Sequence, residues 1–163
     1  MLKIRKAKEK DIKDITKIYN EAILKTNVTF DIKEKSVREM KKWFNNHGTK
    51  NAIIVSEKDK KIVGWAALSK YDYKKAYSKT AEISIYVFEK YQGQGIGKSL
   101  MKEILNEGKN AGIHAVIARI TEGNDISIHL HEEFGFEKVG TLKEVGKKFG
   151  KILDVHIFEF LIK

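Results

Sequence analysis

The sequence predicts an α/β (α+β) fold with one mixed, mostly antiparallel sheet of about seven strands and helices on both of its faces. Short apolar runs alternate with polar residues, as half-buried strands do, for example in residues 2–6. Longer segments, such as 96–111, repeat apolar residues at helical spacing. The 163 residues contain no linker, repeat or low-complexity tract, which indicates a single domain over residues 1–163.

The first half of the chain predicts strands and helices bounded by recognisable signals. Ser36, with Glu39 three residues later, forms a capping box that starts a helix. That helix is expected to end near Gly48, with His47 on the surface, and residues 71–77 look too irregular for a regular element. The expected elements are a strand at 2–6, a helix at 10–25, a break at 26–31, a helix from 36 through Phe44, and a hairpin of strands 52–57 and 61–69 around 58–60.

The second half begins with an apolar strand that leads into a glycine-spaced turn. The strand predicted for 113–120 is almost wholly apolar, which favours burial on both faces. A basic turn is expected at 146–150. The expected elements are a strand at 80–87, a loop at 92–97, a helix at 96–111 closed by Gly112, a strand at 113–120, a helix at 124–134 capped by Gly135, and strands at 136–142 and 152–162.

Charge and composition limit the classes of partner that this protein is expected to bind. The net charge is +10, and its lysines are spread evenly without interleaved aromatic residues. We therefore expect a solvated basic surface first, attraction of a polyanionic cofactor second, and no nucleic-acid partner. The chain lacks cysteine, any apolar run of 18 residues and a signal peptide, so we expect a cytoplasmic protein with no membrane partner.

The stretch 80–97 carries the clearest functional signal. Glycines after a strand allow positive φ angles and close backbone approach, and the first amides of the following helix attract anions. The spacing fits neither the P-loop nor the Rossmann fingerprint, which needs an acidic residue about 20 positions further on. A strand-to-helix turn without a ligand is the alternative interpretation.

Several motifs together resemble the GCN5-related N-acetyltransferases (GNAT), within them the phosphinothricin acetyltransferase branch. The family's acetyl-CoA loop matches Gln92-x-x-Gly95-x-Gly97 after a strand, and its next helix is bounded by an Asn and a Gly-Phe. The remaining matches are Asn124, Gly135-Phe136, Ile18-Tyr19-Asn20, Val28-Thr29-Phe30, Ala76-Tyr77, Thr80-Ala81-Glu82, Tyr86-Val87, Leu130-His131-Glu132 and Val145 to Gly150.

The resemblance implies acetyl-CoA as cosubstrate, no metal, and a small-molecule amine as acceptor, with phosphinothricin, methionine sulfoximine and methionine sulfone as the family's examples. It also implies a homodimer and a sheet splayed in its middle, where the chain stops pairing with its neighbour after Tyr86. Asn124 is expected to bind the CoA arm, to cap its helix, or both. The residues expected to hold the cofactor are Ile85, Tyr86 and Val87 through their backbone, and Gln92, Gly93, Gln94, Gly95, Ile96, Gly97 and Lys98 of the loop.

Two residues are expected to carry proton transfer. Glu82 shares a strand face with Ser84 and Tyr86, and a carboxylate in an apolar strand is costly unless paired or functional. A salt bridge or a solubilising edge charge would also explain it, but Thr80-Ala81-Glu82 matches the family's catalytic segment, so the resemblance implies that Glu82 is the general base. By the family pattern His131 is the expected acid for the leaving thiolate, with a hydrogen-bonded structural histidine as the alternative. No metal-ligating constellation is visible.

The acceptor side is predicted from loops and carries the departures from the family pattern. The expected acceptor-binding residues are Phe30, Lys75, Ala76 and Tyr77, although Phe30 as a core plug and the tyrosines as surface staples are alternatives. The 146–150 turn has either a structural role or binds an acceptor carboxylate through a lysine. The departures are Phe88-Glu89 without the usual proline, Ser78-Lys79 where an arginine often stands, and Lys151-Ile152 in place of Arg-Trp. A protein amine or polyamine acceptor, or a non-catalytic acyl-CoA-binding module, therefore remains as an alternative.

Overall fold

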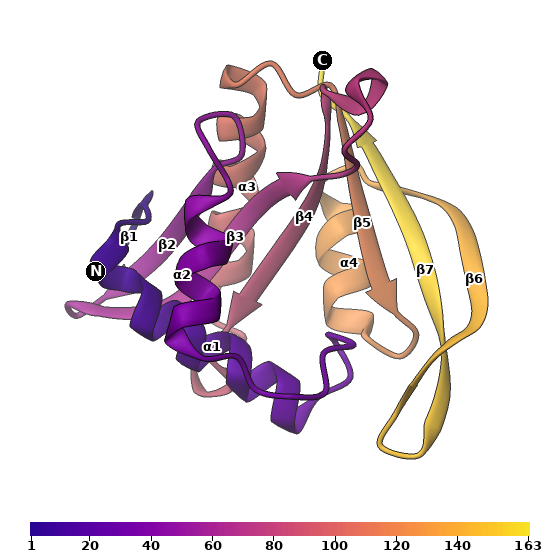
Figure 1. The fold of residues 1–163 in the computed structure, drawn as a ribbon, viewed down its shortest axis with the longest axis horizontal. Helices are drawn as coiled ribbons and strands as arrows, with labels where there is room; N and C mark the ends of the chain where they lie inside the picture. Colours follow the sequence, from indigo (N-terminus) through magenta and orange to yellow (C-terminus); the bar gives the residue numbers. More distant parts are fainter.

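A computed structural model describes all residues, 1–163, and shows one seven-stranded sheet in the order β1-β2-β3-β4-β5-β7-β6 (Figure 1). All neighbouring pairs are antiparallel except β4 and β5, so the mixed, mostly antiparallel sheet is confirmed. The elements are β1 Leu2–Lys6, α1 Ile12–Lys25, α2 Val37–Asn45, β2 Ile53–Lys58, β3 Lys61–Lys70, β4 Thr80–Val87, α3 Ile96–Asn110, β5 Ala115–Thr121, α4 Asp125–Glu133, β6 Glu137–Lys148 and β7 Lys151–Leu161.

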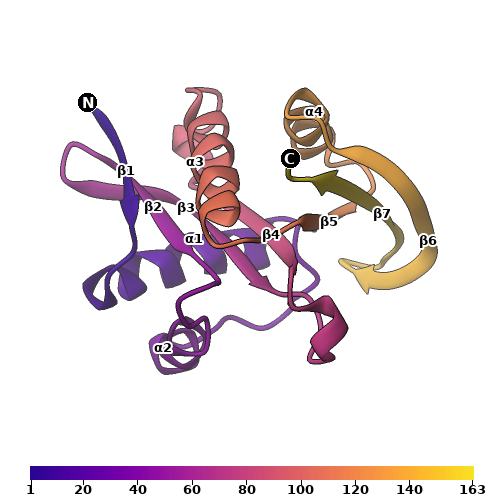
Figure 2. The same cartoon turned by 90° about the horizontal axis from the view of Figure 1, so that it is seen from above.

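Helices cover both faces of the sheet, with α1 and α2 on one side and α3 and α4 on the other (Figure 2). Alternation along β3 sends Trp65 and Ala67 toward α1 and α2, and Ala66 and Leu68 toward α3. The sheet therefore separates two apolar cores, of 16 buried residues on the α3 side and nine on the α1 side. The helices are too short or too polar to serve as membrane-spanning segments.

The sheet opens between β4 and β5. These parallel strands pair only at Thr80, Ala81 and Glu82, whereas β4 stays paired with β3 as far as Val87. Beyond Glu82 the two strands diverge (Figure 1). The central splay that the resemblance implies is therefore present, but pairing with β5 ends at Glu82 and not after Tyr86, so Ile85 and Tyr86 already lie on the unpaired edge.

Two strand predictions need correction. Residues 146–148 belong to β6, because a register shift between Leu142 and Gly146 lets the strand continue past the predicted end at 142. The turn consists only of Phe149 and Gly150, whose φ angles are 50° and 74°. The strand predicted for 113–120 is not buried on both faces, since Arg119 is exposed where the diverging strands leave that face open.

Two smaller predictions were also wrong. His47 is buried, because its Nδ1–H donates to the Trp43 carbonyl at 2.8 Å and its Nε2 accepts from the Ser69 hydroxyl at 3.0 Å. Within 71–77, residues Lys75–Tyr77 form a 3-10 turn. Another such turn, Glu89–Tyr91, joins β4 to the glycine loop.

The β6–β7 hairpin reaches across the open side of the sheet to the segment between α1 and α2. The buried Lys148 donates from Nζ to the Thr29 carbonyl at 2.8 Å. Phe30 lies against Gly146 so closely that a Cβ there would stand 2.1 Å from the ring. These contacts close one side of the region in front of the splay.

Candidate active site at the splay

The glycine loop ends in a helix start whose amides are free. Gly93 and Gly95 have φ angles of 75° and 78°, and nothing lies within 4 Å of the side-chain position of either residue. The first hydrogen bond of α3 runs from Ser99 N to Gly95 O at 3.1 Å. The N–H groups of Ile96, Gly97 and Lys98 precede it and have no partner, so backbone donors and the positive end of the helix dipole meet in an open cradle that fits an anion.

Polar side chains of the loop are tied to neighbouring elements. Lys98 Nζ donates to Glu133 Oε1 at 2.9 Å, which joins α3 to α4. Lys58 Nζ donates to Gln94 Oε1 at 2.7 Å. Gln92 Nε2 donates to the Val87 carbonyl at 3.2 Å, so the loop is fixed to the end of β4.

The edge of β4 that faces β5 lacks a strand partner after Glu82. This edge includes Ile85, Tyr86 and Val87, the residues expected to pair with a cofactor through their backbone. An extended molecule with amide groups fits there as an added strand. The Glu89–Tyr91 turn connects this edge to the glycine loop, and Gln92 ties the start of that loop to the end of β4.

Glu82 stands where the two strands part. Its carboxylate lies on the α1 and α2 face, with a side-chain exposure of 30%, and Oε2 is 3.7 Å from Arg119 Nε. The salt-bridge alternative is thus present as an ion pair, although this distance is too long for a hydrogen bond. The carboxylate is accessible and accepts no hydrogen bond, which leaves it able to take a proton.

His131 is buried and hydrogen-bonded within α4. Its Nδ1–H donates to the Ser127 carbonyl at 2.7 Å, and its ring meets Phe136 edge-on at 4.9 Å. Burial lowers the pKa of His131 below its ordinary value, which favours the neutral ring. The neutral ring carries its proton on Nδ1, so Nε2 is an acceptor, as expected for the structural alternative.

A pocket of about 350 Å³ opens on the sheet face that carries Glu82, and it is lined by Ser84 and Tyr86, the next residues of β4 on that face. Tyr19, Trp65 and Tyr86 form its aromatic wall, with ring centroids 4.9 to 6.0 Å apart. Burial raises the pKa of Tyr86 to about 12, so its hydroxyl stays protonated at neutral pH. The pocket is lined by Tyr19, Asp31, Lys35, Glu39, Met40, Trp43, Trp65, Ser84 and Tyr86.

The four residues expected to bind the acceptor do not line this pocket. Phe30 packs on Gly146 of β6, whereas Lys75, Ala76 and Tyr77 form an exposed turn before β4. The Tyr77 ring meets Tyr71 edge-on at 5.1 Å. The structure therefore does not bring the predicted acceptor residues together at the pocket.

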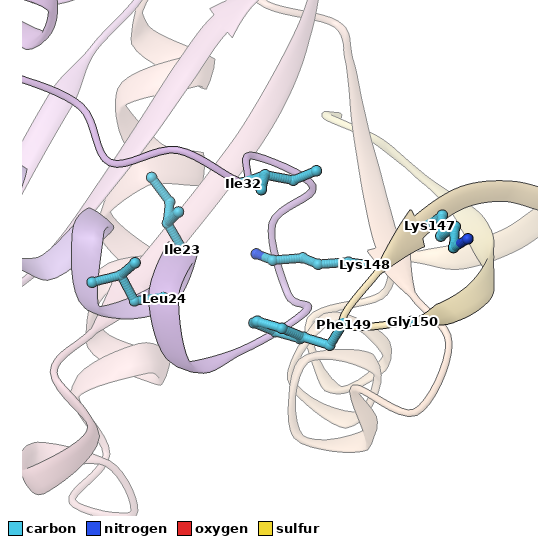
Figure 3. A pocket seen from close by; sticks show the side chains of 7 residues that line it. All are labelled: Ile23, Leu24, Ile32, Lys147, Lys148, Phe149 and Gly150. Carbon is cyan, nitrogen blue, oxygen red and sulfur yellow. The ribbon is translucent and has the colours of Figure 1, made fainter.

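A second hollow, of about 320 Å³, lies between α1 and the tip of the β6–β7 hairpin (Figure 3). Figure 3 shows the Lys148 side chain crossing it toward the α1–α2 segment, with Lys147 turned the other way. Because Lys148 is buried and bonded to Thr29, the structure favours a structural role for this lysine over carboxylate binding.

Two further side chains bear on the predictions. Asn124 is the N-cap of α4, where its Oδ1 accepts from Ser127 N at 3.3 Å, so the capping role is confirmed. Arg119 was missed, although a lone charge in an apolar strand is the same signal that identified Glu82. No group of three or more His, Cys, Asp or Glu side chains forms a possible metal site.

Comparison with known proteins shows similarity along nearly the whole chain. Residues 4–157 match the model of the acetyltransferase (GNAT) domain. Phosphinothricin N-acetyltransferase of Streptomyces coelicolor is 32% identical over 97% of this chain and 95% of that protein. L-methionine sulfoximine/L-methionine sulfone acetyltransferase of Salmonella typhimurium is 31% identical over 93% of this chain and 90% of that protein. The solved structure of a GNAT superfamily phosphinothricin acetyltransferase from Sinorhizobium meliloti, in complex with acetyl-CoA, has a TM-score of 0.95 at 31% identity, covering 99% of this chain and 88% of that one.

Proposed function

Because the chain belongs to the GNAT family of acetyltransferases, we propose that it transfers the acetyl group of acetyl-CoA to the α-amino group of a small amino-acid-like acceptor. Phosphinothricin, methionine sulfoximine and methionine sulfone represent the acceptor class, since relatives of about 30% identity are named for them. The observation that carries the proposal is the position of Glu82, the last paired residue before an unpaired strand edge that leads to the glycine cradle.

The chain's own groups divide the work of binding. The free amides of Ile96, Gly97 and Lys98 bind the diphosphate of acetyl-CoA, and Gly93 and Gly95 allow it to approach the backbone. The open edge at Ile85, Tyr86 and Val87 pairs with the pantetheine amides. Acetyl-CoA supplies the activated acetyl group as a thioester.

Proton transfer is assigned to Glu82. The carboxylate is accessible on the face that holds the aromatic pocket, so an acceptor amine on that face can give up its proton to it, directly or through water. The chain has no cysteine that could form an acyl-thiol intermediate, which agrees with direct transfer between the two substrates. His131 donates from Nδ1 to the Ser127 carbonyl, which supports a positioning role in α4.

We also expect a homodimer that acts in the cytoplasm. The edge strand β6 exposes Val139, Leu142 and Val145, and an exposed apolar edge strand favours pairing with another surface. Absence of cysteine agrees with a reducing compartment. Light scattering coupled to gel filtration tests the dimer, and a monomer at micromolar concentration would contradict it.

A panel of acceptors, assayed by release of free thiol from acetyl-CoA, tests the proposed activity. Methionine sulfone, methionine sulfoximine and phosphinothricin are compared with spermidine and a lysine-containing peptide. Thiol release that depends on the amino-acid-like compounds supports the proposal. Release with spermidine or the peptide alone would overturn the acceptor class, and CoA binding without any turnover would identify a non-catalytic module.

A further inference from the structure

Arg119 lies on β5 at the mouth of the splay, beside the proposed base. Its neighbours Ala118 and Ile120 are buried in the α3-side core, whereas the side chain of Arg119 points to the opposite face and is 52% exposed. Glu82 pairs in register with Ile117, two residues before Arg119 on the same face of β5. The guanidinium therefore stands directly beyond the point at which the strands part.

The hydrogen-bonding capacity of Arg119 is unused. Its Nε lies 3.7 Å from Glu82 Oε2, and its side chain makes no hydrogen bond within the protein. A guanidinium has five N–H donors in a planar fork that matches the two oxygens of a carboxylate. The guanidinium of Arg5, by contrast, donates hydrogen bonds to the carboxylates of Asp11 and Glu57 at 2.7 to 3.1 Å. Arg119 is thus a cation held at the site with its donors available.

From this arrangement we propose that Arg119 binds the carboxylate of the acceptor and sets the specificity of the enzyme for α-amino acids over simple amines. The inference rests on the function proposed above. An α-amino acid carries its amino and carboxylate groups on one carbon, so an acceptor whose nitrogen meets Glu82 holds its carboxylate a few ångströms away. The Glu82–Arg119 pair presents a carboxylate and a guanidinium side by side, and the amino and carboxylate groups of the acceptor are complementary to them in charge.

The other cations near this face are engaged. Lys148 Nζ is buried and donates to the Thr29 carbonyl, and Lys35 Nζ pairs with Asp31 Oδ1 at 3.5 Å. Neither amine contacts Glu82. Arg119 is the cation that does, and for this reason the carboxylate is assigned to it.

An amine without a carboxylate leaves the Glu82–Arg119 ion pair in place and makes no contact with the guanidinium.

The test compares two acceptors in three proteins. Methionine sulfone is paired with the primary amine that remains when its carboxylate is removed. The proteins are the wild type, Arg119→Ala and Arg38→Ala, the last of which removes an exposed arginine from α2 as a control for net charge. For Arg119→Ala we expect kcat/KM for methionine sulfone to fall about 10- to 100-fold, the range for loss of a charge-assisted hydrogen bond, with an unchanged value for the amine. The KM for acetyl-CoA and the Arg38→Ala values should equal those of the wild type.

Three results would overturn the inference. The first is an equal loss for both acceptors in Arg119→Ala, which indicates a structural role, and the second is a wild type that shows no preference for the carboxylated compound. Calorimetry with the same two compounds adds a readout that needs no turnover. The wild type should bind methionine sulfone at least tenfold more tightly than the amine, and Arg119→Ala should not. The third overturning result is a wild type that binds the two compounds equally, or that does not bind methionine sulfone. Turnover of both acceptors without dependence on Arg119 would leave the acetyltransferase function intact, whereas absence of all turnover would count against that function itself.

Discussion

Replacement of Gly146 by alanine tests the contact through which the β6–β7 hairpin closes the acceptor side. A Cβ at Gly146 would stand 2.1 Å from Phe30 Cε2 and 2.5 Å from Cζ, so the ring must leave its position. Phe30 is 36% exposed, so its ring is only partly covered in the wild type and has solvent into which it can move. Overpacking of this kind costs about 1–3 kcal/mol. At roughly 2–4 °C per kcal/mol for a domain of this size, Tm should fall by about 2–12 °C.

Differential scanning calorimetry measures that change, and Gly140→Ala provides a matched control. Gly140 lies in the same strand, and nothing stands within 4 Å of its side-chain position, so this variant should melt like the wild type. In a Phe30→Ala background, Gly146→Ala should cost no further stability, because the clashing ring is gone. If Phe30 borders the acceptor, the Gly146→Ala enzyme also shows a higher acceptor KM with an unchanged KM for acetyl-CoA. A Gly146→Ala protein as stable as the wild type, or equal losses in both backgrounds, would show that the Phe30–Gly146 contact does not stabilise the fold.

Two further predictions concern the cofactor loop and the buried histidines. Gly95→Val places a β-branched residue at φ 78° in the cradle and should raise the KM for acetyl-CoA. Gly112→Val is the control, because Gly112 has a φ of 79° beyond the other end of α3, so this variant carries the same backbone strain and should keep the wild-type KM. Equal KM values for the two variants in steady-state assays would count against the cradle. Burial lowers the pKa values of His47 and His131, so the unfolded chain binds more protons and stability should decrease as pH falls below about 6.5. In melting curves recorded from pH 8 to 5, His131→Gln should reduce the loss of stability with falling pH, whereas replacement of the exposed His129 should not. A wild-type stability that does not change over this pH range would contradict the prediction.

The sheet and the cofactor side of the site follow from local sequence patterns. A lone carboxylate in an apolar strand drew attention to Glu82, and glycine spacing drew attention to the loop around Gly95; the match of both segments to the family's motifs assigned their roles. These motifs are local, because each lies within one strand or the turn that follows it. Glu82 and the loop around Gly95 lie near each other because the strand and the helix that carry them follow one another in the chain.

The acceptor side depends on contacts between distant residues, which local patterns do not contain. The pocket joins Tyr19 of α1, Trp65 of β3 and Tyr86 of β4, and no short segment shows that these rings meet. The burial of His47 likewise depends on Ser69, 22 residues away. The extension of β6 past residue 142 comes from its register with β7, whereas the glycines and lysines of 146–150 indicated a turn. Arg119 could have been predicted from the sequence, since it is a lone charged residue in an otherwise apolar strand, as Glu82 is.

Conversion of Glu82 to glutamine removes the proposed general base while it keeps the size of the side chain. With the best acceptor of the panel, kcat should fall roughly 10²- to 10⁴-fold, the range for loss of a general base. The Kd for CoA, measured by calorimetry, should stay unchanged, because the cradle at Gly93 and Gly95 is untouched. Glu132→Gln, which alters an exposed glutamate on α4, should have wild-type activity. A Glu82→Gln enzyme that turns over at the wild-type rate would show that Glu82 is not the general base.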